Sequence, residues 1–112
     1  EIVITLRGEA EITLRNNQGE RVVMKYDPEE ELFYMNRLKS GDVSFSDNFP
    51  TITSAPTYGP VKQLRIFVDK CSIEALDAEG KMAMTNLVFP TSPYNKLIIK
   101  GKAKAKIYNI GK

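Results

Sequence analysis

A group of reactive side chains lies near the middle of the chain, where Asp69, Lys70, Cys71, Ser72 and Glu74 fall within six positions. Asp69 and Glu74 could supply the two carboxylates that flank the scissile bond in sugar hydrolysis. Cys71 could be a nucleophile, but the chain has no histidine to activate it. Any domain with 14 acidic residues offers many such carboxylate pairs. We therefore expect no catalytic residue in this group.

The residues on either side of the group predict a β-hairpin with Lys70 and Cys71 as its two-residue turn. In that register Asp69 lies opposite Ser72, and both side chains bond local amides. One face of the hairpin is apolar and belongs to the core: Leu64, Ile66, Val68, Ile73 and Ala75. The acid, base, thiol and hydroxyl are then explained by the turn itself.

The other face of the hairpin mixes apolar and charged side chains, with Arg65, Phe67, Glu74 and Leu76 alternating along its two strands. It is too apolar for a plain solvent-exposed face and too charged for a core. We expect Arg65 to pair with Glu74, and we expect these four residues to form a docking surface.

Alternation with period two dominates the rest of the chain and predicts an all-β protein. The expected strands are 1–7, 9–15, 21–26, 31–36, 42–46, 63–69, 72–77, 81–89, 95–100 and 103–110. Residues 47–62 contain three prolines, so we expect a long crossover loop with at most a short edge strand. Short strands separated by turn formers predict an antiparallel two-sheet β-sandwich of the jelly-roll or concanavalin-like kind.

Composition limits the classes of function. The chain has 112 residues, 42% of them hydrophobic, which suits one domain covering 1–112. The net charge of +2 is spread along the chain, so we expect no nucleic-acid partner. No apolar run approaches the ~20 residues of a spanning helix, so we expect no membrane insertion. One cysteine and no histidine lead us to expect no metal site and no cofactor.

Two further features have two interpretations each, and a third has one. Lysines alternate with alanine over 100–106, which could attract polyanions but is more typical of a protected edge strand. Residues 36–41 could hold an anion, but a tight turn in which Arg37 bonds carbonyls is the simpler interpretation. The chain opens inside an expected strand with no initiator methionine or signal segment, and we expect that it is part of a longer protein.

Two stretches resemble a known family. Residues 64–74, followed by Gly80, the strand 82–85 and Phe89-Pro90, resemble the C-terminal β-sandwich domain of glycoside hydrolase family 32, which comprises invertases, inulinases and levanases. Upstream, residues 36–41 resemble the family's aspartate-arginine-x-x-serine-glycine turn. The residues that carry the resemblance are Asn36, Arg37, Ser40, Gly41, Asp69, Ser72 and Glu74. Asn36, Lys70 and Cys71 depart from the aspartate, arginine and serine usual in the family.

The resemblance implies a parent enzyme that hydrolyses β-fructosides through three acidic residues of an N-terminal five-bladed propeller. The propeller motifs are asparagine-aspartate-proline, arginine-aspartate-proline and glutamate-cysteine, and none occurs here: the one Asp-Pro, at Asp27-Pro28, follows Tyr26. The chain thus resembles the accessory domain, which packs on the propeller, stabilises it and is not itself an enzyme. By the same resemblance the parent is secreted, periplasmic or at the cell surface.

A second hypothesis is an autonomous carbohydrate-binding module for fructans. It requires a row of exposed aromatic side chains, including Tyr58 or Tyr94. A fructan contact and a homodimer stay open as further partners. An independent small enzyme is the least favoured hypothesis.

Overall fold

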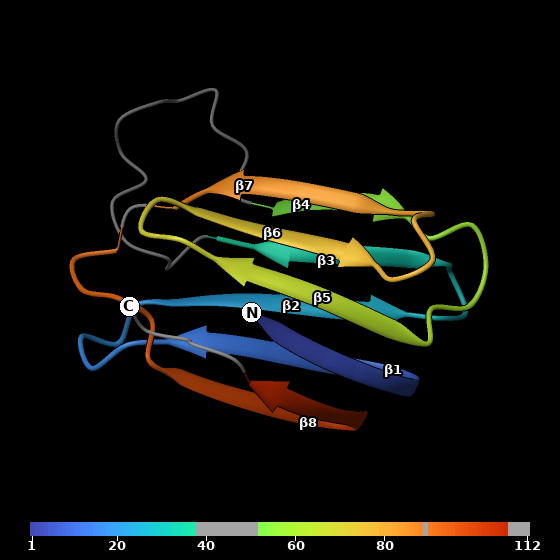
Figure 1. The fold of residues 1–112 in the computed structure, drawn as a ribbon, viewed down its shortest axis with the longest axis horizontal. Helices are drawn as coiled ribbons and strands as arrows, with labels where there is room; N and C mark the ends of the chain where they lie inside the picture. Colours follow the sequence, from blue (N-terminus) through green and yellow to red (C-terminus); the bar gives the residue numbers. More distant parts are fainter. Residues whose placement is uncertain (38–51, 89, 108–112) are drawn as a thin grey trace.

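The computed structural model describes residues 1–37, 52–88 and 90–107, and these residues contain eight strands and no helix (Figure 1). The predicted strand 42–46 and the signature residues Ser40 and Gly41 lie outside the described residues. The strands are β1 (Ile2–Arg15), β2 (Arg21–Asp27), β3 (Leu32–Asn36), β4 (Ile52–Pro56), β5 (Gln63–Val68), β6 (Ser72–Asp77), β7 (Ala83–Leu87) and β8 (Lys96–Ile107).

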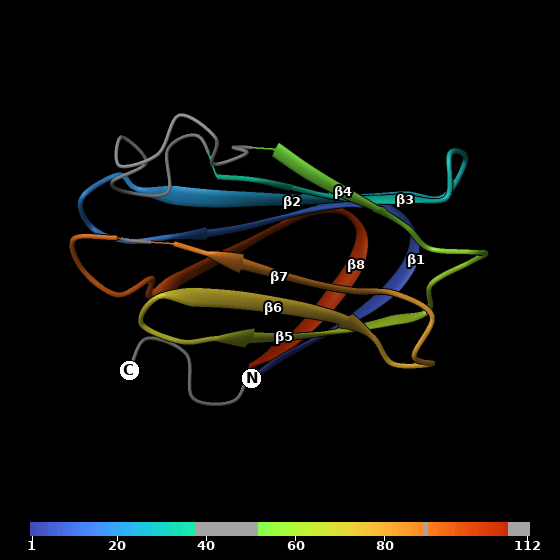
Figure 2. The ribbon, with the colours of Figure 1, turned by 90° about the horizontal axis from the view of Figure 1, so that it is seen from above.

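All the strands pair antiparallel in one sheet that folds over into two layers. The amino-terminal half of β1 pairs with β5 and its carboxyl-terminal half pairs with β2, while β8 follows the other edge of β1 along both halves. Figure 2 shows β2, β3 and β4 in one layer, β5 and β6 in the other, and β1 and β8 curving between them. β7 extends the second layer by pairing with β6. The predicted fold class, an all-β antiparallel sandwich, is confirmed.

Two glycines allow β1 and β8 to bend from one layer to the other. The pairing of these strands shifts between Leu6 and Ala10, beside Gly8. Gly101 has a φ of +99°, and a Cβ there would lie 2.5 Å from the Glu9 carbonyl oxygen. The predicted breaks between 1–7 and 9–15 and between 95–100 and 103–110 are therefore wrong, because these glycines bend continuous strands instead of ending them.

The outermost strands of the sheet, β4 and β7, are joined by side chains. The Thr53 hydroxyl donates to the Met84 sulfur at 3.3 Å, and the Asn86 amide nitrogen donates to the Thr53 oxygen at 3.0 Å. β4 is the short edge strand expected within 47–62. Among the described strands β8 pairs with β1 alone, so the lysine-alanine segment is an edge strand, as predicted.

The core lies between the two layers and follows the period-two pattern of the sequence. Alternate side chains of β1, β2, β3, β5 and β6 point inward and are buried. Large members are Ile2, Ile4, Ile12, Leu14, Met24, Tyr26, Phe33, Met35, Leu64 and Ile66. Burial of this apolar surface is the main stabilising contribution to the sandwich. None of the described elements is a helix able to cross a membrane.

Candidate interaction surface

The hairpin of β5 and β6 has the predicted register. Val68 lies opposite Ile73, and Phe67 lies opposite Glu74. The turn is closed by the Asp69 backbone N–H, which donates to the Ser72 carbonyl at 2.9 Å. The Asp69 carboxylate accepts a 2.7 Å hydrogen bond from the Lys70 backbone N–H. Asp69 thus bonds a local amide, as the sequence predicted for a tight turn.

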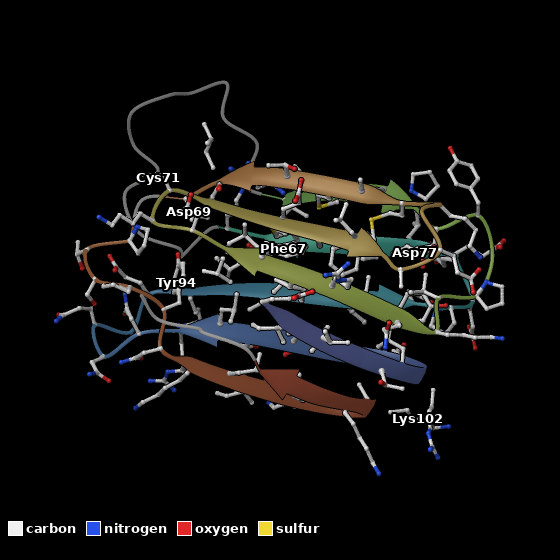
Figure 3. All side chains as sticks on the ribbon, in the orientation of Figure 1. Phe67, Asp69, Cys71, Asp77, Tyr94 and Lys102 are labelled. Carbon is white, nitrogen blue, oxygen red and sulfur yellow. The ribbon has the colours of Figure 1, made fainter. Side chains whose placement is uncertain are left out.

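The outer side of this hairpin carries Arg65, Phe67, Glu74 and Leu76, which we call the hairpin face. The Arg65 guanidinium lies over the Phe67 ring, 5.3 Å from its centre, a cation–π arrangement that fixes both side chains. Phe67, Glu74 and Leu76 are each half-buried. Figure 3 labels Phe67 on β5, within the layer that β5, β6 and β7 form.

The predicted pairing of Arg65 with Glu74 is wrong. Arg65 contacts the Glu1 carboxylate at 2.5 Å. The reason is the position of β1, whose Val3 lies directly opposite Arg65 and brings Glu1 within reach. Glu74 instead accepts a 3.3 Å hydrogen bond from the Thr85 hydroxyl of β7. The basic end of the hairpin face is therefore tied to the first residue of the chain.

Apolar side chains extend the hairpin face onto both neighbouring strands. Ala83 of β7 lies opposite Leu76, and Leu87 lies opposite Ser72 with 51% of its surface exposed. On the other side, Val3 of β1 is half-buried. The face combines aliphatic side chains with an aromatic ring and an arginine, the two residue types here that are enriched in protein–protein interfaces.

A hollow of about 300 Å³ lies beside the hairpin turn. Its walls are Val68, Asp69 and Lys70 on one side and residues 90–94 on the other. Asp69 lines this hollow and Glu74 does not, so the hollow does not bring the two carboxylates together. In the part of the chain that the structure describes, no cluster of three metal-ligating residues occurs.

The wall formed by residues 90–94 is held by a network that the sequence did not reveal. The Glu20 carboxylate accepts hydrogen bonds from the Thr91 backbone N–H at 2.7 Å and from the Thr91 hydroxyl at 2.9 Å. The buried Asn16 amide donates to Glu20 at 2.9 Å and to the Ser92 carbonyl at 2.8 Å. Burial raises the pKa of Glu20, but the hydrogen bonds from Asn16, Thr91 and Ser92 outweigh it and lower that pKa overall.

The signature residue Arg37 directly follows β3 and is buried. Its guanidinium donates to the Leu87 carbonyl of β7 at 2.7 Å, which links the two layers. Burial lowers the pKa of Arg37. The prediction that Arg37 bonds a carbonyl is confirmed.

The two tyrosines proposed for sugar stacking are not in one row. Tyr94 is only 1% exposed, whereas Tyr58 is 71% exposed. Tyr58 lies in the loop between β4 and β5, and Tyr94 lies between β7 and β8. In Figure 1 these two connections lie at opposite ends of the sandwich. Figure 3 shows Tyr94 at the same end as Asp69 and Cys71.

The chain is similar to known proteins over nearly its whole length. The model of the family described as "Glycosyl hydrolases family 32 C terminal" matches residues 2–110. An extracellular exo-inulinase from Aspergillus awamori is 34% identical over 93 residues, which are 80% of this chain and 16% of that protein. A levanase from Bacillus sp. (strain L7) is 33% identical over 79 residues, which are 69% of this chain and 9% of that protein.

A solved structure agrees with the fold. The crystal structure of exo-inulinase from Aspergillus awamori superposes with a TM-score of 0.83 at 24% identity, covering 97% of this chain and 24% of that one. The chain therefore spans less than a quarter of the length of each of these relatives. The family match covers β1 to β8 and includes residues 36–41 and 64–74. On this evidence the chain belongs to the C-terminal domain family of the family 32 glycosyl hydrolases.

Proposed function

We propose that the chain is the non-catalytic C-terminal domain of a fructan-hydrolysing glycoside hydrolase and packs through its hairpin face on an N-terminal catalytic domain. The relatives named exo-inulinase and levanase support the class of the parent enzyme. This chain covers 16% and 9% of them, which leaves ample length for a propeller domain. The extracellular relatives support a secreted parent.

The observation that carries the docking proposal is the position of the hairpin face beside the start of the chain. Glu1 contacts Arg65 directly, and Figures 1 and 2 show the amino terminus next to β5. A domain joined ahead of Glu1 would start beside the Arg65 end of the hairpin face. Aromatic and arginine side chains contribute most to the binding energy of typical interfaces, and the stacked Phe67–Arg65 pair offers both.

The docking proposal is tested in the parent protein by the double substitution Phe67→Asp and Leu76→Asp. Two buried carboxylates in an apolar contact would detach the domain, so we expect the catalytic domain to melt earlier and to lose activity faster on heating. The control is Ile52→Asp, which places a carboxylate at an apolar, 58% exposed position on the outer side of the other layer. An unchanged melting profile for the double variant would remove the hairpin face as the docking surface.

The non-catalytic assignment has its own test. Purified chain 1–112 is incubated with sucrose, inulin and levan, and we expect no release of fructose. Turnover that disappears in Asp69→Asn or Glu74→Gln would overturn the assignment and restore the carboxylate pair as a catalytic site.

A second candidate function is contact with a fructan end in the hollow beside the hairpin turn. The hollow offers a carboxylate from Asp69, an ammonium from Lys70 and a hydroxyl from Thr91, which are groups that can bond sugar hydroxyls. Its volume of about 300 Å³ is at the small end of ligand pockets. Calorimetry with levan and inulin oligomers decides: heat that Lys70→Ala abolishes supports this contact, and no heat at millimolar oligomer rules it out.

A further inference from the structure

Three cationic side chains lie side by side on the outer surface of the layer opposite the hairpin face. Arg15 of β1 lies directly opposite Arg21 of β2 on one side and directly opposite Lys96 of β8 on the other. We call Lys96, Arg15 and Arg21 the basic row. Directly opposite residues on neighbouring strands have their Cβ atoms about 4.5–5.5 Å apart, and like charges at that spacing destabilise a sheet.

Four residues before Arg15 in β1, the same three strands have acidic and basic side chains next to one another. There Glu11 lies between Lys25 of β2 and Lys100 of β8, so an acid separates two bases. The positions between these two rows are uncharged, with Thr13 opposite Val23 and Ile98. Alternating charge is the ordinary stabilising pattern on an exposed sheet. The basic row departs from the pattern of the charged row at Glu11 on the same three strands.

No acidic side chain of the described residues neutralises the basic row. The ion pairs among them are Arg65 with Glu1 and Lys81 with Glu79. Glu20, which precedes Arg21 in the sequence, accepts hydrogen bonds from Asn16 and Thr91 and is in neither of these ion pairs. Arg21 and Lys96 are exposed and Arg15 is half-buried. Within the described residues the three charges therefore repel one another without an ion-pair partner.

A shallow groove of about 290 Å³ runs beside the basic row. Arg15, Gly19 and Arg21 line one end of it, and Val23 and Ile98 line its middle. Glu11 lies toward the other end, between its two lysines. The excess of positive charge is thus at the end formed by the β1–β2 turn, where an anion could approach the two guanidinium groups.

We propose that the basic row is a binding site for a multivalent oxyanion of the phosphate or sulfate class. Two guanidinium groups can each donate a pair of parallel hydrogen bonds to such an anion, and the Lys96 ammonium adds a third positive charge. A dianion offsets the repulsion among the three cations. A chloride ion carries one charge and offsets much less of it. The site is independent of the docking proposal because it lies on β1, β2 and β8, on the outer side of the other layer.

The test measures thermal unfolding of chain 1–112 in sodium phosphate and in sodium chloride of equal ionic strength. Because only the folded chain has the basic row assembled, bound phosphate raises the melting temperature. Glycerol phosphate, a monoester, is the second arm. If inorganic phosphate stabilises the chain and the monoester does not, the ligand is a free anion. If the monoester stabilises it as well, the site also accepts a phosphate group carried on a larger molecule.

Substitutions separate the site from general charge effects. In Arg21→Gln we expect phosphate affinity to fall about tenfold or more, because a charge-assisted pair of hydrogen bonds is lost. In chloride the same variant melts at the same temperature as the parent chain or higher, because one repulsive contact has been removed. If Arg21→Gln folds poorly, Lys96→Gln takes its place, and we expect the same two results: weaker phosphate binding and an unchanged or higher melting temperature in chloride.

Lys25→Gln is the matched control, since Lys25 is on the same strand and face as Arg21 but lies directly opposite an acidic residue, Glu11. We expect it to keep the stabilisation by phosphate. Equal melting temperatures in phosphate and chloride, or an equal loss of the phosphate effect in Lys25→Gln and Arg21→Gln, would overturn the site.

Discussion

The Glu20 carboxylate connects two parts of the chain that are 71 residues apart. It accepts hydrogen bonds from Asn16 and from both the backbone and the hydroxyl of Thr91, and these bonds hold the loop at residues 90–94. They also favour the charged carboxylate over the protonated one, which is why the pKa of Glu20 is lowered below its ordinary value of 4.5. One side chain thus determines both the position of the loop and part of the acid stability.

This lowered pKa predicts how stability depends on pH. A carboxylate whose pKa is lower in the folded chain than in the unfolded chain stabilises the fold above its ordinary pKa, and the contribution is lost as pH falls through the folded-state pKa. In Glu20→Gln we therefore expect a lower free energy of unfolding at neutral pH and a smaller drop between about pH 5 and about pH 3. Urea unfolding at several pH values across that range measures the free energy of unfolding of each variant. The exposed Glu29 supplies the control variant Glu29→Gln, and identical pH curves for the two variants would contradict the role of Glu20.

At the scale of elements, the bend in β1 and β8 joins the two layers. Gly101 makes the bend possible, because its positive φ and its closeness to the Glu9 carbonyl leave no room for a Cβ. Gly8, opposite this region in β1, is different: an added Cβ there would first meet the Lys102 side chain, 3.0 Å away at Cδ. A flexible side chain can move aside, whereas a backbone carbonyl within a ladder cannot.

The two glycines therefore predict unequal effects of an added methyl group. Gly101→Ala combines a strained backbone with a backbone clash, and we expect a loss of at least about 1–3 kcal/mol in the free energy of unfolding. For Gly8→Ala we expect less than about 1 kcal/mol, since Lys102 can change rotamer. Chemical denaturation of the two variants in parallel measures the difference. Equal losses would show that the bend does not depend on Gly101.

The sequence predicted elements well where the determining contacts are local. The β5–β6 register follows from a two-residue turn and from alternation on both sides of it, all within residues 64–76. The bends at Gly8 and Gly101 were predicted as strand ends, because glycine has the same local meaning in a turn and in a bend. Which one occurs depends on β1 pairing with both β2 and β5, which no local pattern reveals.

The same limit applies to the candidate sites. The residues of the hairpin face could be chosen from the sequence, because alternation along two adjacent strands places them together. The contact of Arg65 with Glu1 could not be, because it depends on β1 lying beside β5. The basic row was missed for the same reason: Lys96 lies beside Arg15 only through the pairing of β8 with β1.

At the scale of the whole molecule, the sandwich has two outer surfaces with different properties. The layer of β5, β6 and β7 carries the hairpin face, with its stacked Arg65 and Phe67 and its aliphatic neighbours. The layer of β2, β3 and β4 is flanked by the basic row. A domain that docks on the first surface leaves the second open to solvent, so the parent enzyme would present the basic row outward.

The most direct measurement of the docking proposal is hydroxyl-radical footprinting of chain 1–112 and of the parent protein under the same conditions. Phe67 and Leu76 report on the hairpin face, and the exposed Tyr58 on the loop between β4 and β5 is the internal control. We expect Phe67 and Leu76 to be oxidised in the isolated chain and protected in the parent, with Tyr58 oxidised in both. Equal oxidation of Phe67 and Leu76 in the two proteins would contradict the proposal that this face packs on the catalytic domain.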